Sequence, residues 1–534
     1  MPVQGRLKFW GWGLEAEVLS RHEVSAIEAA YAHRFGIAAY EVTPAPRAEE
    51  IRLRAPRVTP PESLREVCST EHYQRLLHSY GRSFFDSARI FARDFANPPD
   101  VVAFPRDERE IVAVLDWCDS VNAVAIAWGG GSSVVGGVEP PRTGRHVVTI
   151  DLKHLGRVLE IDTTSQAARI QGGTYGPALE SQLKPSGLTL RHFPQSFEFS
   201  TLGGWIATRS GGHYATLYTH IDDFVESLRV VTPAGSLESF RLPGSGAGPS
   251  PDRLFIGSEG ILGIITEAWM RLRPRPIFRA ATSARFNDFY QAAQCVRAIS
   301  QSHLYPANTR LLDAGEALVN GAGDGRHSIL VLTFESADRP QEANLQRALE
   351  IVRANAGEYD EGVLNTDGAQ RQGAAGQWRD SFLRMPYYRE VLTPRGIIAD
   401  TFETSITWDR FPDFHAKVKA ETERAIEEVT GTKGVVTCRF THVYPDGPAP
   451  YFSFHALGDK RRLVEQCWAI KIAASEVLNA LGGTITHHHA VGRDHRRWYD
   501  KQRPDLFAGA LRAAKQSLDP HGIMNPGVLV DPLA

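Results

Sequence analysis

The fold of this chain is decided by a glycine-rich turn that directly follows an apolar strand, Trp128-Gly129-Gly130-Gly131-Ser132-Ser133-Val134. Glycine adopts positive φ angles and lets backbone N–H groups approach a ligand, and serine hydroxyls add further donors. A strand that ends in such a turn is suited to a pyrophosphate group. The turn is not a GxGxxG fingerprint, no GK[ST] sequence follows it, and three glycines alone are equally typical of an ordinary tight turn.

Two more loops rich in glycine and serine follow within roughly 140 residues, one over 199–212 and the other over 257–267. Each of the three loops is joined to an apolar strand or helix. A series of this kind indicates one extended ligand that lies across several loops. A long dinucleotide has a suitable shape.

Composition narrows the class of protein. The chain has 534 residues, 42% hydrophobic and 23% charged, which is typical of a globular protein with two or three domains. Its net charge of −3 gives no electrostatic support for nucleic-acid binding. Five scattered cysteines without a CxxC pair favour a reducing compartment and no disulfides. Because the sequence has neither a signal-peptide core nor an apolar run of membrane-spanning length, we expect a cytoplasmic protein; peripheral membrane association stays open.

Apolar periodicity divides the chain into four parts. Residues 1–95 are interpreted as an N-terminal helical segment, and 96–275 contain the three glycine loops. In 276–500, strand and helix patterns alternate, which predicts an antiparallel sheet covered by helices, and 501–534 form a C-terminal segment. The predicted class is therefore α+β. The main predicted strands are 99–105, 123–127, 146–152, 168–171, 328–334, 434–443 and 450–455, and the main predicted helices are one capped by Asp107, then 175–183, 286–300, 342–356 and 413–429.

Three consecutive histidines, His487, His488 and His489, stand between a β-branched run and a glycine. In an extended backbone, successive side chains point to opposite faces, so we expect His487 and His489 on one face and His488 on the other. Neighbouring imidazoles disfavour each other's protonation, and at least one should stay neutral near pH 7 and serve as a base. A lone histidine is more often structural, but three in a row beside glycines indicate a functional site.

The three glycine loops, in this order, resemble the flavin-binding domain of the vanillyl-alcohol oxidase family, whose fold is shared with p-cresol methylhydroxylase. The resemblance implies FAD, with a cap domain over the flavin and a C-terminal segment, containing Asn525, that returns to it. It assigns Gly129, Gly130, Gly131, Ser132 and Ser133 to the pyrophosphate, Ser200, Thr201, Gly203, Gly204, Thr208 and Ser210 to the flavin and ribityl region, and Glu259, Gly260, Gly263 and Ile265 to the adenine side.

Other segments narrow the resemblance. Flavin-dependent 2-hydroxyacid dehydrogenases of this group have Gly-Glu-His-Gly at the histidine run, so His488 replaces their glutamate. The triplet, together with the Trp-Gly-Trp-Gly start and the segments 198–205, 402–405 and 437–439, resembles the alkylglycerone-phosphate synthases, also called alkyldihydroxyacetonephosphate synthases. This resemblance spans nearly the whole chain.

The resemblance implies a lipid-like substrate and noncovalent FAD. The acyl chain of acyl-dihydroxyacetone phosphate would be exchanged for a fatty alcohol through an adduct with flavin N5, with no net redox change. Tyr451 aligns with the catalytic tyrosine, and a period-two pattern places it on one face with Ser453 and His455. Arg439 and, less closely, Arg389 match arginines suited to a phosphate. We also expect a homodimer.

Several alternatives stay open. The choice of base among the three histidines is not fixed, with His489, which matches the dehydrogenase histidine, slightly favoured. The main rival function is an FAD-linked 2-hydroxyacid dehydrogenase or oxidase, and a lipid-binding protein with a relic flavin is another. A metal site is disfavoured, because the rings of adjacent histidines on a strand diverge.

Overall fold

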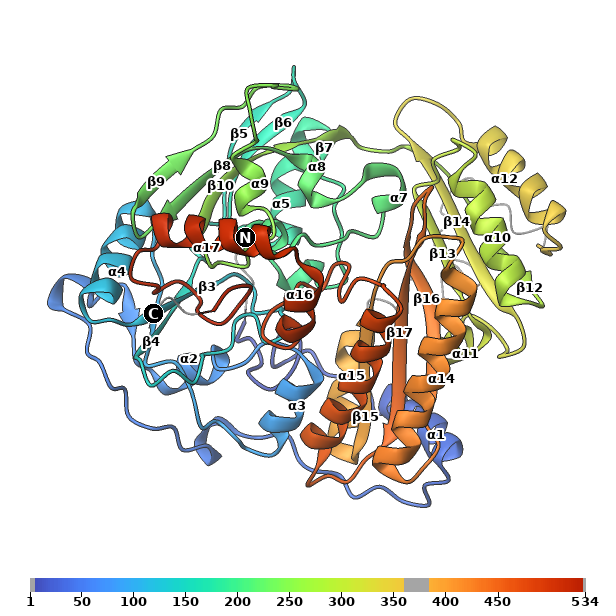
Figure 1. Cartoon of the computed structure of the whole chain (residues 1–534), viewed down its shortest axis with the longest axis horizontal. Coiled ribbons are helices and arrows are strands. Elements are labelled where there is room, and N and C mark those ends of the chain that lie inside the picture. The colour runs from blue at the N-terminus through green and yellow to red at the C-terminus, as the bar shows by residue number, and fades with distance from the viewer. Residues whose placement is uncertain (1–4, 360–383, 532–534) are drawn as a thin grey trace.

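The computed structural model describes residues 5–359 and 384–531 and consists of two bodies side by side (Figure 1). One body contains the three glycine loops, and the other is built on a large sheet from the C-terminal half of the chain. Helices and mainly antiparallel strands occur in both, which confirms the predicted α+β class. We call the second body the cap.

The first sheet of the glycine-loop body positions the first loop. Its strands have the order β1 (Cys68–Ser69), β2 (Val101–Ala103), β4 (Val147–Asp151) and β3 (Val124–Trp128). β2, β4 and β3 are parallel and almost wholly buried, as is usual for strands covered on both faces. Asp107 caps the intervening helix α4 (Glu108–Ser120) by accepting a hydrogen bond from the Glu110 N–H at 3.0 Å, as predicted.

A second, antiparallel sheet completes this body and positions the other two loops. Its order is β5 (Val158–Asp162), β6 (Ala167–Gln171), β10 (Ile264–Arg271), β8 (Val225–Thr232) and β9 (Gly235–Glu238). The helix α6 (Leu202–Thr208) begins inside the second glycine loop and packs against β10 and β6. The third loop leads directly into β10.

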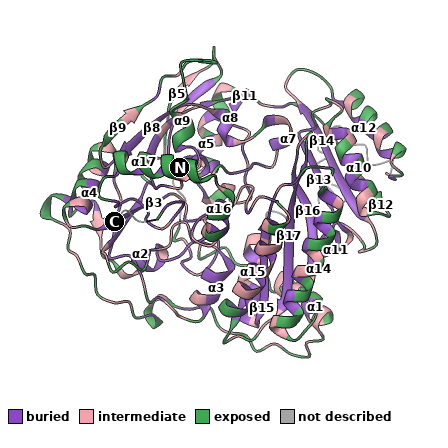
Figure 2. Ribbon diagram, viewed as in Figure 1, coloured by how far each residue is buried: buried purple, intermediate pink, exposed green. Residues whose placement is uncertain are grey.

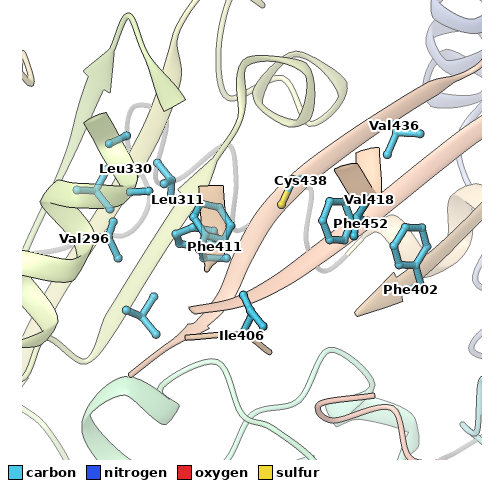
Figure 3. Close-up of a cluster of buried hydrophobic side chains, with 14 of the residues drawn as sticks. Val296, Leu311, Leu330, Phe402, Ile406, Phe411, Val418, Val436, Cys438 and Phe452 are labelled. Carbon is cyan, nitrogen blue, oxygen red and sulfur yellow. The ribbon is translucent and has the colours of Figure 1, made fainter. Parts of the chain in front are cut away.

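The cap is a six-stranded antiparallel sheet. The strand order is β12 (Phe278–Phe286), β14 (Ser328–Ser336), β13 (Asn308–Leu312), β16 (Val435–Val443), β17 (Pro448–Leu457) and β15 (Ile397–Glu403). Four helices lie along it: α10 (Phe289–Ser300), α12 (Glu342–Ala354), α14 (Phe411–Thr430) and α15 (Leu463–Ala480) (Figure 1). Aromatic and aliphatic side chains such as Phe402, Phe411 and Phe452 fill the space between sheet and helices (Figure 3).

The C-terminal segment returns to the first body. After α16 (Arg496–Gln502) and α17 (Asp505–Leu518), the chain runs beside β3, where the Ala125 N–H donates to the Ile523 carbonyl at 2.8 Å. Burial follows this architecture: the strands of both bodies are largely buried, and exposure concentrates on the outer helices and loops (Figure 2). None of the described helices is long and apolar enough to cross a membrane.

Candidate active site

A large cavity lies between the three glycine loops and side chains of the cap sheet. Its empty space, including the part open to solvent, amounts to about 2360 Å³. Every residue that the sequence assigned to the cofactor lines this cavity: Gly129, Gly130, Gly131, Ser132, Ser133, Ser200, Thr201, Gly203, Gly204, Thr208, Ser210, Glu259, Gly260, Gly263, Ile265 and Asn525.

The first glycine loop offers backbone donors to a ligand. Within the described part of the chain, no backbone N–H of residues 130–133 donates a hydrogen bond. Gly131 has a φ of 65°, a left-handed conformation that glycine adopts without strain. Gly130 touches the second loop so closely that a Cβ there would lie 1.8 Å from the Phe199 carbonyl oxygen. N–H groups gathered in this way at the end of a strand suit a pyrophosphate.

The second loop contains a buried polar atom that a ligand would satisfy. Thr201 Oγ1 is buried and makes no hydrogen bond to any residue that the structure describes. An unsatisfied buried hydroxyl is costly, so a polar group of a bound molecule would stabilise this loop. A Cβ at Gly204 would meet only Thr201 Oγ1, at 3.6 Å, which leaves this turn of α6 open to the cavity. The loops therefore fit a dinucleotide such as FAD.

The histidine run does not form the extended segment that the sequence suggested. Residues 487–489 lie in a series of bends that wrap around the buried carboxylate of Glu403, at the end of β15. This carboxylate accepts hydrogen bonds from the backbone N–H groups of His487 at 2.6 Å, His488 at 3.1 Å and His489 at 2.9 Å. Three successive N–H groups that converge on one anion require a curved backbone, and the prediction of an extended segment is wrong for this reason.

The three imidazoles consequently face different ways than predicted. His488 and His489 both line the cavity, whereas His487 is not among its lining residues, and His487 Nε2 instead hydrogen bonds with the Tyr444 hydroxyl at 2.6 Å. Burial, together with the neighbouring His488, lowers the pKa of His487 to about 3. Burial also holds the pKa of His489 well below its usual value. Both rings are therefore neutral at pH 7.

Glu403 adds charge as well as shape to this site. Its Oε2 lies 3.3 Å from His488 Nδ1, and its Oε1 lies 3.9 Å from His489 Nδ1. Burial opposes ionisation of this carboxyl, but the adjacent His488 and His489 overcome that effect and hold the pKa of Glu403 well below its usual range. An ionised carboxylate thus lies directly behind His488, which lines the cavity.

A second carboxylate binds the C-terminal end of the segment 487–492, which we call the histidine loop. Glu259, from the third glycine loop, accepts hydrogen bonds from the N–H groups of Val491 at 2.8 Å and Gly492 at 2.7 Å. Burial raises the pKa of Glu259 to about 7. Asn525 ties the C-terminal segment to the same place, because its amide donates to the Glu259 carbonyl at 2.9 Å. Glu259 lines the cavity as expected, and its carboxylate ties the end of the histidine loop to the glycine-loop body.

A further histidine, His442 on β16, was not anticipated in this cluster. Nitrogen atoms of His442, His487 and His488 lie within 4.8 Å of one another, close enough to share one metal ion. The rings of these adjacent histidines therefore do not diverge as predicted, since His487 Nδ1 and His488 Nδ1 are only 3.0 Å apart. The bend around Glu403 turns the two rings toward each other.

Tyr451 lies beside the histidines. The predicted alternation along β17 is confirmed, since Tyr451 lines the cavity together with Ser453 and His455 while the intervening phenylalanines are in the core. The rings of Tyr451 and His488 are nearly parallel, with centroids 6.0 Å apart. The guanidinium of Arg439 lies 4.0 Å from the centre of the Tyr451 ring. Arg439 Nη1 donates to Glu316 Oε1 at 2.5 Å, in a fully buried ion pair.

Two more arginines reach the same cavity. Arg389, a predicted site residue, lines it and donates to the Arg82 carbonyl at 2.5 Å. Arg310 on β13 lines it as well, and burial together with the nearby Arg439 lowers the Arg310 pKa to about 9. Neither Arg310 nor the role of Glu403 was anticipated from the sequence. Glu403 stands in the recognised segment 402–405, but nothing in the sequence indicated that its carboxylate binds the histidine loop.

Comparisons with known proteins define the class of the fold. Residues 99–241 match the family described as FAD binding domain, and residues 275–529 match the C-terminal domain of FAD linked oxidases. The structure of p-cresol methylhydroxylase is similar over 96% of this chain, with a TM-score of 0.68 and 14% identity, and shares its fold. The protein is thus a flavoprotein with the FAD-linked oxidase architecture, as the sequence predicted.

Full-length relatives narrow the class to one family. Alkyldihydroxyacetonephosphate synthase of Caenorhabditis elegans is 31% identical, with 87% of this chain and 81% of that protein covered. The synthase of Trypanosoma brucei brucei is 30% identical over 90% of this chain and 82% of its own length. A solved alkyldihydroxyacetonephosphate synthase has a TM-score of 0.82 and 26% identity, with 97% of this chain and 98% of the other covered. The chain belongs to the alkyldihydroxyacetonephosphate synthase family.

Proposed function

We propose that this protein exchanges the acyl chain of acyl-dihydroxyacetone phosphate for a fatty alcohol, with FAD bound noncovalently across the three glycine loops. The observation that carries the proposal is the position of His488. This imidazole lines the cavity, lies in front of the ionised Glu403 carboxylate and faces the ring of Tyr451. FAD, when bound, supplies an electrophile for the substrate carbon that loses its proton.

His488 is the base in this proposal. The hydrogen on substrate C1 is acidified only by the neighbouring ketone, so its removal requires a positioned neutral base. The Glu403 carboxylate, 3.3 Å from His488 Nδ1, stabilises the imidazolium that forms. His489 also lines the cavity and is farther from Glu403, at 3.9 Å. The geometry therefore favours His488 over His489, the residue that the sequence slightly favoured.

Tyr451 is the proton donor to the departing carboxylate. Burial raises its pKa, so the phenol is protonated at neutral pH. Its hydroxyl hydrogen bonds with Thr401 Oγ1 at 3.1 Å, which fixes its direction. Arg439, against the face of the Tyr451 ring, holds the ring in place and favours negative charge on the phenol oxygen during proton transfer.

The cavity offers suitable side chains for both the phosphate and the alkyl chain of the substrate. Arg310, Arg389 and Arg439 bring three guanidinium groups to one cavity, where they suit a phosphate monoester. Aliphatic and aromatic side chains also line the cavity and suit an alkyl chain: Tyr31, Val319, Met385, Tyr388 and Leu392. Peripheral membrane association and a homodimer accompany this proposal as predictions; vesicle flotation and light scattering test them.

An anaerobic exchange assay tests the function. The protein is incubated with acyl-dihydroxyacetone phosphate and a radiolabelled fatty alcohol in the absence of any electron acceptor. We expect labelled alkyl product, one fatty acid released per alcohol incorporated, and a flavin that is oxidised at the end. Full bleaching of the flavin by a 2-hydroxyacid, without alcohol incorporation, would instead establish the rival dehydrogenase. Unchanged lipid binding without either reaction would indicate a lipid-binding protein.

A further inference from the structure

A continuous chain of hydrogen-bonding side chains leads away from the cavity at His488. His488 Nδ1 and His487 Nδ1 are 3.0 Å apart, and His487 Nε2 is 2.6 Å from the Tyr444 hydroxyl. That hydroxyl also hydrogen bonds with His220 Nε2. Each of the two inner members, His487 and Tyr444, therefore contacts one neighbour on either side.

The outer end of this chain reaches the surface region of the molecule. Tyr444 and His220 are only half-buried. Their neighbours in sequence, Thr219 on one side and Pro445 and Asp446 on the other, are exposed. The inner end, in contrast, lines the cavity. These hydrogen-bonded side chains thus connect the cavity with the solvent side of the molecule.

We propose that His488, His487, Tyr444 and His220 form a proton relay between the substrate carbon and solvent. The proposal rests on the function proposed above, in which His488 removes a carbon-bound proton. Each member is an imidazole or a phenol, which both donates and accepts hydrogen bonds, and can take a proton at one atom while it releases another proton. The four side chains meet this requirement without a gap.

The proton balance is complete along the chain. As His488 Nε2 takes the proton from substrate C1, Nδ1 releases its proton to His487 Nδ1. His487 Nε2 releases a proton to the Tyr444 oxygen, and the Tyr444 hydroxyl proton passes to His220 Nε2. His220 Nδ1 releases one proton to solvent. Every hydrogen bond in the chain is reversed, and return of a proton along the same path restores the starting state.

The surroundings keep the intermediate members neutral. Burial lowers the pKa of both His487 and His220, and burial raises the pKa of Tyr444 far above neutrality. The ring of His442, 4.9 Å from that of His487 and 5.3 Å from that of His220, adds a further neutral group, because burial holds its pKa well below the usual value. Neither His487 nor His220 therefore retains a second proton as a stable cation at pH 7.

Glu403 and the relay have different tasks. Glu403, 3.3 Å from His488 Nδ1, stabilises the newly formed imidazolium, and His487, at 3.0 Å from the same nitrogen, offers the way out for its proton. The hydrogen taken from carbon stays on His488 Nε2, and the proton that leaves through His487 is the one that Nδ1 carried. The number of protons that move in the same step, rather than the rate alone, distinguishes a relay from a structural hydrogen-bond network.

The experiment measures the solvent deuterium isotope effect on alkyl exchange, and its dependence on the deuterium fraction of the solvent, in the full chain with bound FAD. We expect the wild-type protein to show a curved dependence on that fraction, because several relay protons move in the same step. Tyr444→Phe keeps the ring but interrupts the relay, and we expect turnover to fall about 100-fold, within the range of general acid–base contributions, with a linear dependence on the deuterium fraction. Tyr40→Phe is the matched control, because the Tyr40 hydroxyl only donates to the Glu28 carbonyl outside the site, at 2.9 Å.

A second variant guards against a simple structural defect. His220→Ala opens the outer end of the relay, and we expect added imidazole to restore turnover and the curved isotope dependence to this variant and not to Tyr444→Phe. A curved dependence in Tyr444→Phe identical to that of the wild-type protein overturns the relay, whether or not turnover is slower. If the wild-type protein exchanges no alcohol, the proposed function itself has failed, and this result differs from failure of the relay alone.

Discussion

The two sides of the cavity are built in different ways. On the glycine-loop side, backbone N–H groups and small side chains from three short stretches of sequence line the space. On the cap side, the functional groups are single side chains from β13, β15, β16, β17 and the histidine loop, which are far apart in sequence. The glycine-loop side thus binds its ligand through many weak contacts, whereas the cap side carries the catalytic groups on a few side chains.

This difference teaches which changes each side tolerates. A backbone donor is not removed by most substitutions, so the glycine-loop side should be sensitive mainly where an added Cβ meets another loop. A catalytic side chain has no substitute, so the cap side should lose activity without losing its cofactor. Substitutions on the two sides therefore separate FAD binding from catalysis.

The largest expected effect is on the cap side. His488→Gln keeps a polar side chain of similar size but removes the base, and we expect turnover to fall about 1000-fold, within the range for general acid–base catalysis. The flavin absorbance spectrum and FAD content should remain those of the wild-type protein. The alkyl-exchange assay measures turnover. His22→Gln, on the exposed surface of α1 (Arg21–Phe35), is the control. Turnover within tenfold of wild type would assign the base to another residue.

Gly130→Ala tests the other side at its tightest contact. The new Cβ would lie 1.8 Å from the Phe199 carbonyl oxygen, so the first and second loops must separate. We expect FAD affinity to fall about 100-fold, because overpacking costs roughly 1–3 kcal/mol or more. Flavin fluorescence on dilution measures this loss. Gly246→Ala, where an added Cβ meets no atom within 4 Å, should bind FAD normally; equal affinity of both variants would contradict the loop contact.

The same difference explains what could be predicted from the sequence. The glycine loops are local, since strand, turn and small residues are adjacent, and so their positions and the α+β class followed from pattern and resemblance. Glu403 and Arg310 lie on strands whose pairing brings them to the site from distant segments, and no local pattern marks them. The bend at His487 was missed for the same reason, because its cause is a carboxylate 84 positions earlier in the chain.

A smaller effect is expected where the two sides meet. Burial raises the pKa of Glu259 to about 7, above the value of 4.5 for an ordinary glutamate. The folded chain therefore binds this proton more tightly than the unfolded chain, and the resulting stability is complete below pH 4.5 and is lost as the pH rises to 7. Glu259→Gln cannot ionise, so between these pH values its melting temperature should decline a few degrees less than that of wild type.

Melting curves of the FAD-loaded protein across this pH range check the prediction. Glu267→Gln is the matched control, because Glu267 lies on β10 and pairs with Arg169 away from the histidine loop. Wild type and Glu259→Gln with parallel pH profiles would show that the Glu259 carboxyl does not link folding to protonation.

The smallest expected effect comes from a single hydroxyl of the first glycine loop. Ser132 lines the cavity, whereas the adjacent Ser133 uses its Oγ to accept a hydrogen bond from the Gly137 N–H at 3.0 Å. Ser132→Ala should weaken FAD binding only about threefold, because one neutral hydrogen bond contributes roughly 0.5–1.5 kcal/mol and the backbone donors remain. Ser133→Ala should instead lower the melting temperature of the protein without FAD, since it removes an internal loop contact. Titration of FAD and thermal unfolding of both variants separate the two roles, and a loss of FAD affinity in Ser132→Ala as large as that in Gly130→Ala would show that this side, too, depends on individual side chains.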